Sequence, residues 1–471
     1  MVELRTKLTD DERDIVNKLT GQLGKLTPQD RLNNAYYEGA QRLKHIGLAV
    51  PEEFRIFELV ANWPRMYVDE VARRQKVKGI YRPGEGKADP ILQEAFVANN
   101  LGAEVPILAK ENMIFGRMYA TVGTNEDDKE HPLITVESPR QMSCLVNQRR
   151  RRMEAALRRF REQDGTQVAT LFLPDKTIQL VMGRNGWDID PVGADDGIDN
   201  HRLGRVPVVL FLNRRRLGKW YGTTEMADVI PLTDACARAL TDLQYGVETV
   251  AVQKRYVLGV SKGDFVDKEG NPLPVWQSYF DALWATQKSA KDVTVGQLAG
   301  ADLSNFHNTV KLYAELASSV TGLPFRYFGA NTANPAAEGA IRADESRIIS
   351  NAEEKNAHLG VGLGWTLALY ERFRTNKWPD SGEPFMVEWR NPATPTRSEE
   401  ADAIQKLNGG TPVLSREGSW DEMGWNEARK SRERGYFADE AKDPILDRLN
   451  RNLNDPGNQA VEPDDAAAGI G

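Results

Sequence analysis

Residues 224–253, TEMADVIPLTDACARALTDLQYGVETVAVQ, decide the fold that we expect. Their apolar side chains step by three or four residues, which places them in one stripe along an amphipathic helix. Because Pro231 lacks a backbone N–H and its ring crowds the preceding turn, we expect a kink or a restart of the helix there. The members of the stripe are Val229, Leu232, Cys236, Leu240, Leu243, Val247 and Val250.

Two further helices are predicted downstream of this stretch. Residues 304–320 form an apolar face at helical spacing, and Gly322 and Pro324 end that helix. A long helix follows over about 335–374. It contains three glycines, each of which costs on the order of 1 kcal/mol relative to alanine in a helix interior. We therefore expect a bend or a close helix contact at Gly360, Gly362 and Gly364.

Upstream of residue 224 the pattern changes from helical to extended. From 132 to 212 the hydrophobic period moves toward two, which indicates strands. Residues 170–173 and 177–181 flank Pro174-Asp175-Lys176, a hairpin signature. The whole chain therefore predicts an α+β fold, rich in helices and with a β-rich part. The helices expected before the strands cover 8–26, 62–74 and 103–115.

The composition limits the classes of protein to consider. The chain has 471 residues, 27% of them charged, and a formal net charge of −7, which is typical of a folded soluble protein. The negative sign argues against a free DNA-binding domain, which is usually basic. Cys144 and Cys236 lie far apart, so we expect a reducing cytoplasm and no disulfide framework. We also expect no signal peptide, and the strongest apolar run, 206–212, is too short to cross a membrane.

No motif for catalysis or for cofactor binding is predicted. Gly84-Glu85-Gly86-Lys87 is followed by Ala88, so it lacks the hydroxyl residue of a phosphate-binding loop. The glycines at 360–364 fall in a helical pattern and do not follow a strand, as a dinucleotide loop would. The five histidines are scattered and no serine sits in a nucleophile elbow. We therefore expect no enzymatic activity and no catalytic, cofactor-binding or metal-binding residues.

An arginine-rich stretch is the sharpest electrostatic feature. Between Arg140 and Arg161 there are eight arginines and one acid, and 214–216 form a second arginine cluster. Such clusters contact nucleic-acid phosphates or an acidic protein face, or they guard a solvated outer sheet edge. We favour the sheet edge, because few aromatic residues interleave as stacking platforms. The candidate basic contact patch consists of Arg149, Arg150, Arg151 and Arg152.

Seven short stretches carry a resemblance by their order and spacing. They are YYEG at 36–39, NWPRMYVD at 62–69, IFGRMY at 114–119, TVESPR at 135–140, DVIPLTDA at 228–235, TGLP at 321–324 and NPAAEGAI at 334–341. Each is weak alone. Together, over about 26–374, the chain resembles the bacteriophage portal family, especially the SPP1-like portals common in phages of actinobacteria.

The resemblance implies a portal fold with wing, stem, clip and crown regions and a long kinked helix. The glycine at 339, near the start of that helix, makes its boundary less sharp. The implied regions are a wing at 1–223, a stem helix at 224–253, a clip at 254–303, a return stem helix at 304–322, a tunnel loop at 323–334, the long helix and wing return at 335–394, a crown at 395–450 and a disordered tail at 451–471.

The resemblance also implies partners and site residues. Family members form rings of twelve subunits at one capsid vertex, through which double-stranded DNA is packaged and ejected. The implied partners are the terminase large subunit, a head–tail adaptor, and the major capsid and scaffold proteins, with assembly in the host cytoplasm. The aromatic residues of the tunnel loop either pack against the core or project toward the DNA. The implied site residues are Leu323, Pro324, Phe325, Arg326, Tyr327, Phe328, Asn331 and Asn334 in the DNA-facing tunnel loop, and Val229, Leu232, Leu240, Leu243 and Val247 in stem packing.

Two other classes of function stay open at this point. One is a metal-dependent DNA-processing nuclease, with acids gathered from several segments. The other is a different oligomeric structural protein of the virion. Metal-dependent cleavage of DNA by the pure protein would indicate the first, and ring stoichiometry would separate the second from a portal.

Overall fold

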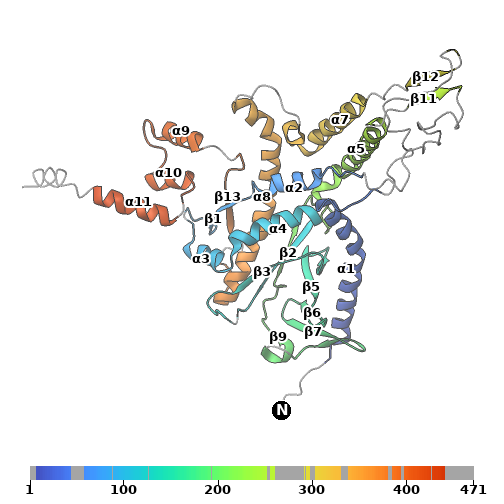
Figure 1. Ribbon diagram of the computed structural model, residues 1–471. Coiled ribbons are helices and arrows are strands. Elements are labelled where there is room, and N and C mark those ends of the chain that lie inside the picture. The colour runs from blue at the N-terminus through green and yellow to red at the C-terminus, as the bar shows by residue number, and fades with distance from the viewer. Residues whose placement is uncertain are drawn as a thin grey trace, which may run out of the picture. The chain divides into compact units, whose positions relative to one another are not determined.

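Figure 1 shows the computed structural model of the protein, which combines helices with antiparallel sheets. The mixed helical and sheet composition predicted from the sequence is confirmed. The chain divides into two compact units, Met1–Ala393 and Thr394–Gly471. The expected disordered tail and most of the expected clip lie outside the described residues. The structure describes residues 7–43, 58–86, 88–125, 127–191, 194–251, 255–259, 291, 293–297, 303–329, 338–379, 384–393, 397–425 and 427–440.

Helix α1, Asp10–Tyr37, begins with a capping box. The Thr9 hydroxyl accepts a hydrogen bond from the Glu12 N–H, and the Glu12 carboxylate accepts one from the Thr9 N–H at 2.8 Å. This arrangement satisfies two of the N–H groups that a helix start leaves free. The helix then lies against a sheet through the buried residues Val16 and Leu19.

The expectation that this first helix ends near residue 26 is wrong. Pro28 lies inside the helix, which continues to residue 37. Two residues after the proline, Asp30 forms a buried ion pair with Arg117 of strand β2, Arg117–Gly123, with an N–O distance of 2.7 Å. Tertiary contacts of this kind override the local cost of an interior proline.

A six-stranded antiparallel sheet lies beside α1 (Figure 1). Its strands follow the order β4-β5-β6-β7-β8, and β9 pairs with β7. The hairpin predicted around Pro174-Asp175-Lys176 is confirmed, with Phe172 opposite Thr177. The strands are β4 Met142–Asn147, β5 Arg152–Arg161, β6 Gln167–Phe172, β7 Thr177–Gly183, β8 Gly186–Ile189 and β9 Ile198–Asp199.

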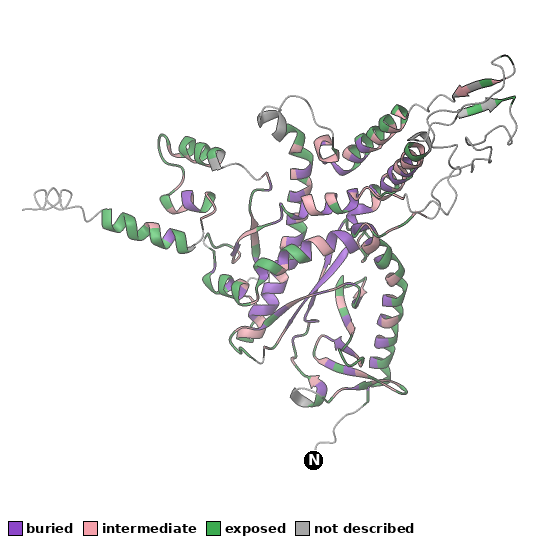
Figure 2. Cartoon of the chain, viewed as in Figure 1, coloured by how far each residue is buried: buried purple, intermediate pink, exposed green. Residues whose placement is uncertain are grey.

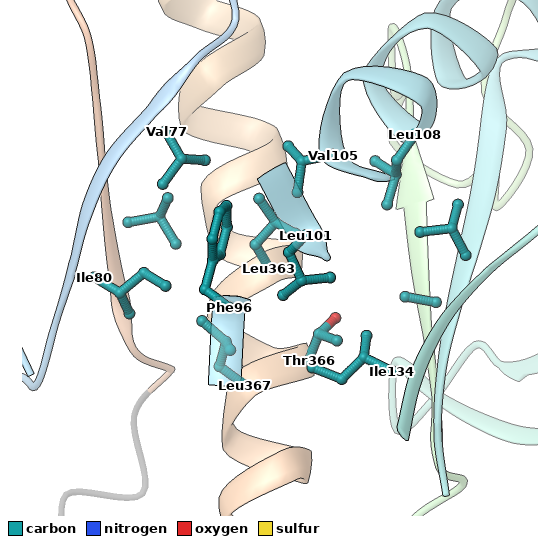
Figure 3. A pocket seen from close by; sticks show the side chains of 13 residues that line it. Val77, Ile80, Phe96, Leu101, Val105, Leu108, Ile134, Leu363, Thr366 and Leu367 are labelled. Carbon is teal, nitrogen blue, oxygen red and sulfur yellow. The ribbon is translucent and has the colours of Figure 1, made fainter. Parts of the chain in front are cut away.

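The long helix α8, Glu338–Thr375, packs against a second sheet of order β10-β2-β3 and against the β1-β13 pair. Figure 2 shows buried residues along the sides of α8 and of this sheet. The apolar side chains in Figure 3 close around a space of only about 10 Å³, so this region is core and holds at most one water. The other elements are α2 Trp63–Ala72, β1 Val77–Tyr81, α3 Pro90–Ala98, α4 Leu101–Phe115, β3 Leu133–Glu137, β10 Val208–Leu212 and β13 Met386–Trp389.

The glycines of α8 allow strands to approach its backbone. A Cβ on Gly364 would lie 2.1 Å from the backbone oxygen of Phe385, and one on Gly362 would lie 2.3 Å from the ring of Phe211. Gly360 also faces β13, because a Cβ on Gly360 would lie 3.2 Å from the indole nitrogen of Trp389. The close contacts at these glycines are made with β10 and with residues at and just before β13, and not with another helix as the sequence predicted.

Helices α5, Ile230–Ala251, and α7, Ser304–Thr321, pack side by side (Figure 1). Pro231 lies in the first turn of α5, where its missing N–H costs little, so it starts the helix. Gly322 ends α7 in a left-handed conformation, with φ of 72°. Between these two helices in the chain, β11 pairs with β12. The remaining elements here are the 3₁₀ helices η2 Ala194–Gly197, η3 Glu225–Asp228 and η5 Phe325–Phe328, and the strands β11 Arg255–Leu258 and β12 Thr294–Gln297.

The second unit is small, and a stack of aromatic rings with an arginine at each end packs its helices together. Trp420 stacks on Trp425 at 5.7 Å and on Phe437 at 5.8 Å between ring centroids. Arg429 and Arg416 cover the two ends, each 4.0 Å from a ring centroid. Such contacts help a short segment that cannot build a large core. Its helices are α9 Arg397–Asn408, α10 Arg416–Glu422 and α11 Glu427–Glu440.

Replacing Gly364 with alanine should lower the free energy of unfolding by about 1–3 kcal/mol, because the added Cβ meets backbone that cannot move freely. The matched control is Gly24→Ala in α1, where nothing lies within 4 Å of a Cβ. Gly24→Ala should raise the free energy of unfolding by up to about 1 kcal/mol. Chemical denaturation measures both, and a stabilising Gly364→Ala would contradict the close contact.

Candidate functional site

A buried ion pair joins four segments of the first unit. The Lys355 ammonium of α8 lies 2.6 Å from a carboxylate oxygen of Glu225, the first residue of η3. The two side chains are 11% and 6% exposed. The same carboxylate accepts hydrogen bonds from Asn213, which follows β10, at 3.0 Å and from the Tyr67 hydroxyl of α2 at 2.7 Å. One carboxylate therefore holds α2, β10, η3 and α8 together.

The electrostatics keep this network in a single protonation state. Burial acts to raise the pKa of Glu225, but the Lys355 ammonium and the hydrogen bonds from Asn213 and Tyr67 outweigh it, so the pKa is lowered. Burial and the Glu225 charge raise the pKa of the Tyr67 hydroxyl far above its usual value. Asn351 donates to the tyrosine oxygen at 3.1 Å. The carboxylate stays ionised and the phenol stays a donor, as a structural tie requires.

A polar cleft of about 320 Å³ opens beside this network. The buried side-chain oxygens of Gln75 and Asn112 are part of its lining and have no hydrogen-bond partner among the described residues. More cationic than acidic side chains line it, in a chain whose net charge is −7. The cleft is therefore a candidate surface for an anionic partner. Its charged residues are Arg214, Arg215, Arg347 and Lys355 against Glu225 and Glu354.

The expected tunnel loop begins with residues that pack against the core. Leu323 is 1% exposed and Pro324 is also buried. The ring of Phe328 meets that of Trp63 of α2 edge-on, with 5.5 Å between centroids, and Phe325 packs against the same apolar cluster. Of the two alternatives for the loop aromatics, packing against the core therefore holds for Phe325 and Phe328.

The charge of the loop is paired within the chain. Arg326 donates to Asp344 at 2.6 Å and to Glu345, both in the second turn of α8. Tyr327 also donates to Glu345, at 3.4 Å. These carboxylates neutralise the guanidinium, so a contact between Arg326 and DNA stays a prediction. The other expected loop residues, Asn331 and Asn334, lie outside the described residues.

The stem stripe is divided between buried and exposed positions. Val229 is 1% exposed, and Leu232 and Leu240 pack against the apolar cluster formed by α2, α4, α7 and α8. Leu243 is half-buried, whereas Val247, one turn further along α5, is 42% exposed. The first part of the stripe packs within the chain, and its far end is available to a partner.

Three of the four arginines, 149–151, lie in an exposed turn between β4 and β5, and Arg152 is the exposed first residue of β5. The Asn147 side-chain oxygen accepts hydrogen bonds from the Arg149 and Arg150 N–H groups, each at 2.9 Å, and Arg151 has a positive φ of 50°. The turn joins β4, an edge strand of the six-stranded sheet, to β5, so the interpretation of this run as guarding a sheet edge stays a prediction. The positive charge of the run is therefore concentrated in the turn between β4 and β5.

The described residues contain no cluster of three His, Cys, Asp or Glu side chains that could hold a metal ion. The glycine series 360–364 lies in the middle of α8, as its helical pattern predicted. Among the helices described, none combines the length and the apolar character needed to cross a bilayer.

The residues of the buried network were not predicted as site residues from the sequence. Thr224-Glu225 directly before an apolar helix is a capping signal, and the Thr224 side chain does accept a hydrogen bond from the Met226 N–H. Nothing local indicates that the glutamate is buried, because its partner Lys355 stands 130 positions further along the chain. Only tertiary structure brings the two together.

Comparisons with known proteins identify the family. Residues 26–450 match the family described as "Phage portal protein, SPP1 Gp6-like". The portal protein of Mycobacterium phage D29 is 34% identical over 428 residues, which cover 87% of this chain and 85% of that protein. The portal protein of Mycobacterium phage L5 is 34% identical over 426 residues, with the same two coverages. Among solved structures, the chain is similar to a protein in the virion of a native gene transfer agent particle, at 12% identity and a TM-score of 0.43, over 80% of this chain and 94% of that one.

These matches define the class of protein as a structural component of a virion. The chain belongs to the SPP1 Gp6-like family of phage portal proteins, and the resemblance that its motifs predicted is confirmed. The relatives give no support to the nuclease alternative.

Replacing Lys355 with methionine should lower the free energy of unfolding by about 3–5 kcal/mol near neutral pH, because the buried Glu225 carboxylate loses its counter-charge. The pKa of Glu225 is lower in the folded protein than in the unfolded chain, where it is about 4.3. The ionised carboxylate therefore stabilises the folded wild type at pH values above about 4.3, and this stabilisation is lost as the pH falls through the pKa of the folded state. In the variant the carboxylate takes up a proton more readily, so the difference between the two proteins should shrink toward acid pH.

Chemical denaturation of both proteins at several pH values measures this difference. The double variant Glu225→Gln/Lys355→Met should recover part of the lost stability, because no unpaired buried charge remains. A loss of equal size at every pH would show that Lys355 acts through its alkyl chain alone.

Proposed function

We propose that this portal protein assembles into a closed ring at one capsid vertex, and that the ring is the channel for DNA packaging and ejection. The observation that carries the proposal is a second apolar face on α7. One face of α7 packs on α5. The other exposes Leu312, Leu316 and Val320, which are 52%, 43% and 46% exposed and stand at i, i+4 and i+8.

A subunit with two different apolar faces suits a ring. When one face of a subunit binds a different face of the next, the same contact repeats from copy to copy. The copies form a closed ring when the rotation between neighbours divides a full turn evenly. The stripe on α7 and the exposed Val247 at the far end of α5 supply such unlike surfaces. Apolar burial contributes about 25 cal/mol per Å² at every repeat of the interface. The number of subunits that the family resemblance implies is twelve.

We assign the portal regions to the observed elements. Helices α5 and α7 are the two stem helices, the β11–β12 pair belongs to the clip, and the crown begins at residue 395. The division of the chain into two units after Ala393 supports that last boundary. The clip docks the terminase large subunit and later the head–tail adaptor. The major capsid and scaffold proteins are further partners, and the ring assembles in the host cytoplasm.

We also assign residues 323–334 to a tunnel loop that faces the DNA. The loop connects α7 with α8, so it can reach into a channel that these helices line. Gly329 has a positive φ of 91° and ends η5. Arg326 is the one cation in the sequence of this segment, and a phosphate would compete with Asp344 and Glu345 for it.

Leu316→Asp should prevent ring formation while leaving the subunit folded, because Leu316 is exposed in the single chain and becomes buried only against a partner. Leu240→Asp is a poorer test, since Leu240 packs against the subunit's own core. Mass measurement and electron micrographs of the purified protein decide the outcome. Val97→Asp, at an apolar position of α3 that is 71% exposed, is the matched control and should keep normal rings. Rings of normal mass from Leu316→Asp would contradict the proposed interface.

Arg326→Gln should leave ring yield normal but reduce the length of genome retained per particle, because the loop loses its phosphate-directed charge without gaining a new one. Glutamine is preferable to glutamate here, since a third carboxylate beside Asp344 and Glu345 would disturb the loop by itself. Arg372→Gln, at a half-buried position in the last turn of α8, is the control. Full-length genomes in Arg326→Gln particles would remove the DNA contact from this residue.

A further inference from the structure

The segment 214–222 is a loop whose two ends are held together. The Thr223 N–H donates to the Asn213 oxygen at 3.1 Å, and the Asn213 side-chain amide donates to the Thr223 oxygen at 2.9 Å. The backbones of Gly222 and Gly116 touch, and a Cβ on Gly222 would lie 1.8 Å from the Gly116 oxygen. A compact surface loop with joined ends is an Ω-loop, a type that is frequently functional.

This loop presents cations to solvent. Residues 214–221, RRRLGKWY, contain four cations and no acid, and we call them the basic loop. Leu217 is 93% exposed, so the tip stands clear of the rest of the subunit. The Arg215 guanidinium lies over the Trp220 ring, 4.7 Å from its centroid. Stacking fixes the plane of the guanidinium and leaves its N–H edge free to donate.

The cations of the basic loop are mostly unpaired. Arg214 donates to Asp228 at 2.6 Å. In the part of the chain that the structure describes, Arg215, Arg216 and Lys219 form no ion pair with a carboxylate. In a chain with more acids than bases, three neighbouring cations without acids form a local positive surface.

The positive surface continues from the basic loop across the polar cleft. Arg214 and Arg215 line the cleft from one side, and Arg347 of α8 lines it as well. Arg347 donates to the Ser319 backbone oxygen at 2.9 Å and, among the described residues, has no carboxylate partner. The one exposed acid of the cleft is Glu354, whose side chain is 77% exposed. A rigid polyanion can therefore meet several cations at once.

The chemistry of the basic loop favours a phosphate backbone over bases. Guanidinium groups bind phosphate oxygens with two parallel hydrogen bonds. Trp220 is already covered by Arg215, so the loop offers no free aromatic platform for an unstacked base. What it can recognise is the outside of a duplex.

We propose that the basic loop, together with Arg347, binds the sugar–phosphate backbone of double-stranded DNA without regard to sequence. The inference rests on the proposed function, because it needs a duplex at the ring. It places a DNA contact on the wing side of the stem, apart from the tunnel loop. Contact with three or four phosphates gives weak binding that falls steeply with salt, which suits DNA that has to be held and then released.

The test uses the purified full-length chain and a fluorescently labelled duplex of random sequence several helical turns long. The loop variant is Arg215→Ala/Arg216→Ala/Lys219→Ala. Its affinity, measured by fluorescence anisotropy, should fall at least about tenfold at low salt. The slope of log affinity against log salt concentration should become less steep by up to about 2.7 for three lost phosphate contacts.

The matched control is Arg149→Ala/Arg150→Ala/Arg151→Ala, which removes three exposed arginines from the β4–β5 turn and should change the affinity much less. Equal losses in the two variants would overturn the proposal, since general charge would then explain the binding. No binding by the wild type, or unchanged binding by the loop variant, would also overturn it. Ring mass is measured in parallel, so normal rings with unchanged DNA affinity would defeat this inference and leave the proposed function standing.

Discussion

The buried ion pair between Glu225 and Lys355 fixes where four segments of the subunit meet. Removing two charges from water costs several kcal/mol per ion, and only good geometry and further hydrogen bonds repay that cost. Asn213 and Tyr67 supply those bonds. Any other arrangement of α2, β10, η3 and α8 would leave a charge or a polar group buried without a partner, so the network contributes specificity of fold more than net stability.

The two loops that we connect with DNA both depend on this arrangement. Asn213 bonds to both members of the ion pair and also closes the base of the basic loop. Helix α8 carries Lys355 and, about three turns earlier, the Asp344 and Glu345 carboxylates that hold Arg326. Helix α8 therefore contacts the base of one loop and forms the ion pairs of the other.

The sequence predicts the elements that depend on neighbouring residues, and it fails for features that depend on contacts between residues far apart in the chain. The helix α5, the end of α7 at Gly322 and the hairpin around residues 174–176 rest on periodicity and turn chemistry, and they are confirmed. The end of α1 was wrong because the ion pair of Asp30 with Arg117 lies outside any local pattern. The same limit hid the buried network, whereas the charged and loop segments of the candidate site were visible as runs of residues.

Net charge is a weak guide to what the surface of this protein contacts. A formal charge of −7 argues against DNA binding only if the whole chain acts at once. Exposed charges are screened over about 8 Å at physiological salt, so a phosphate senses the cations beside it and little of the rest. A loop closed at its base by Asn213, with three cations that form no ion pair among the described residues, can therefore attract a phosphate backbone locally although the chain as a whole is acidic.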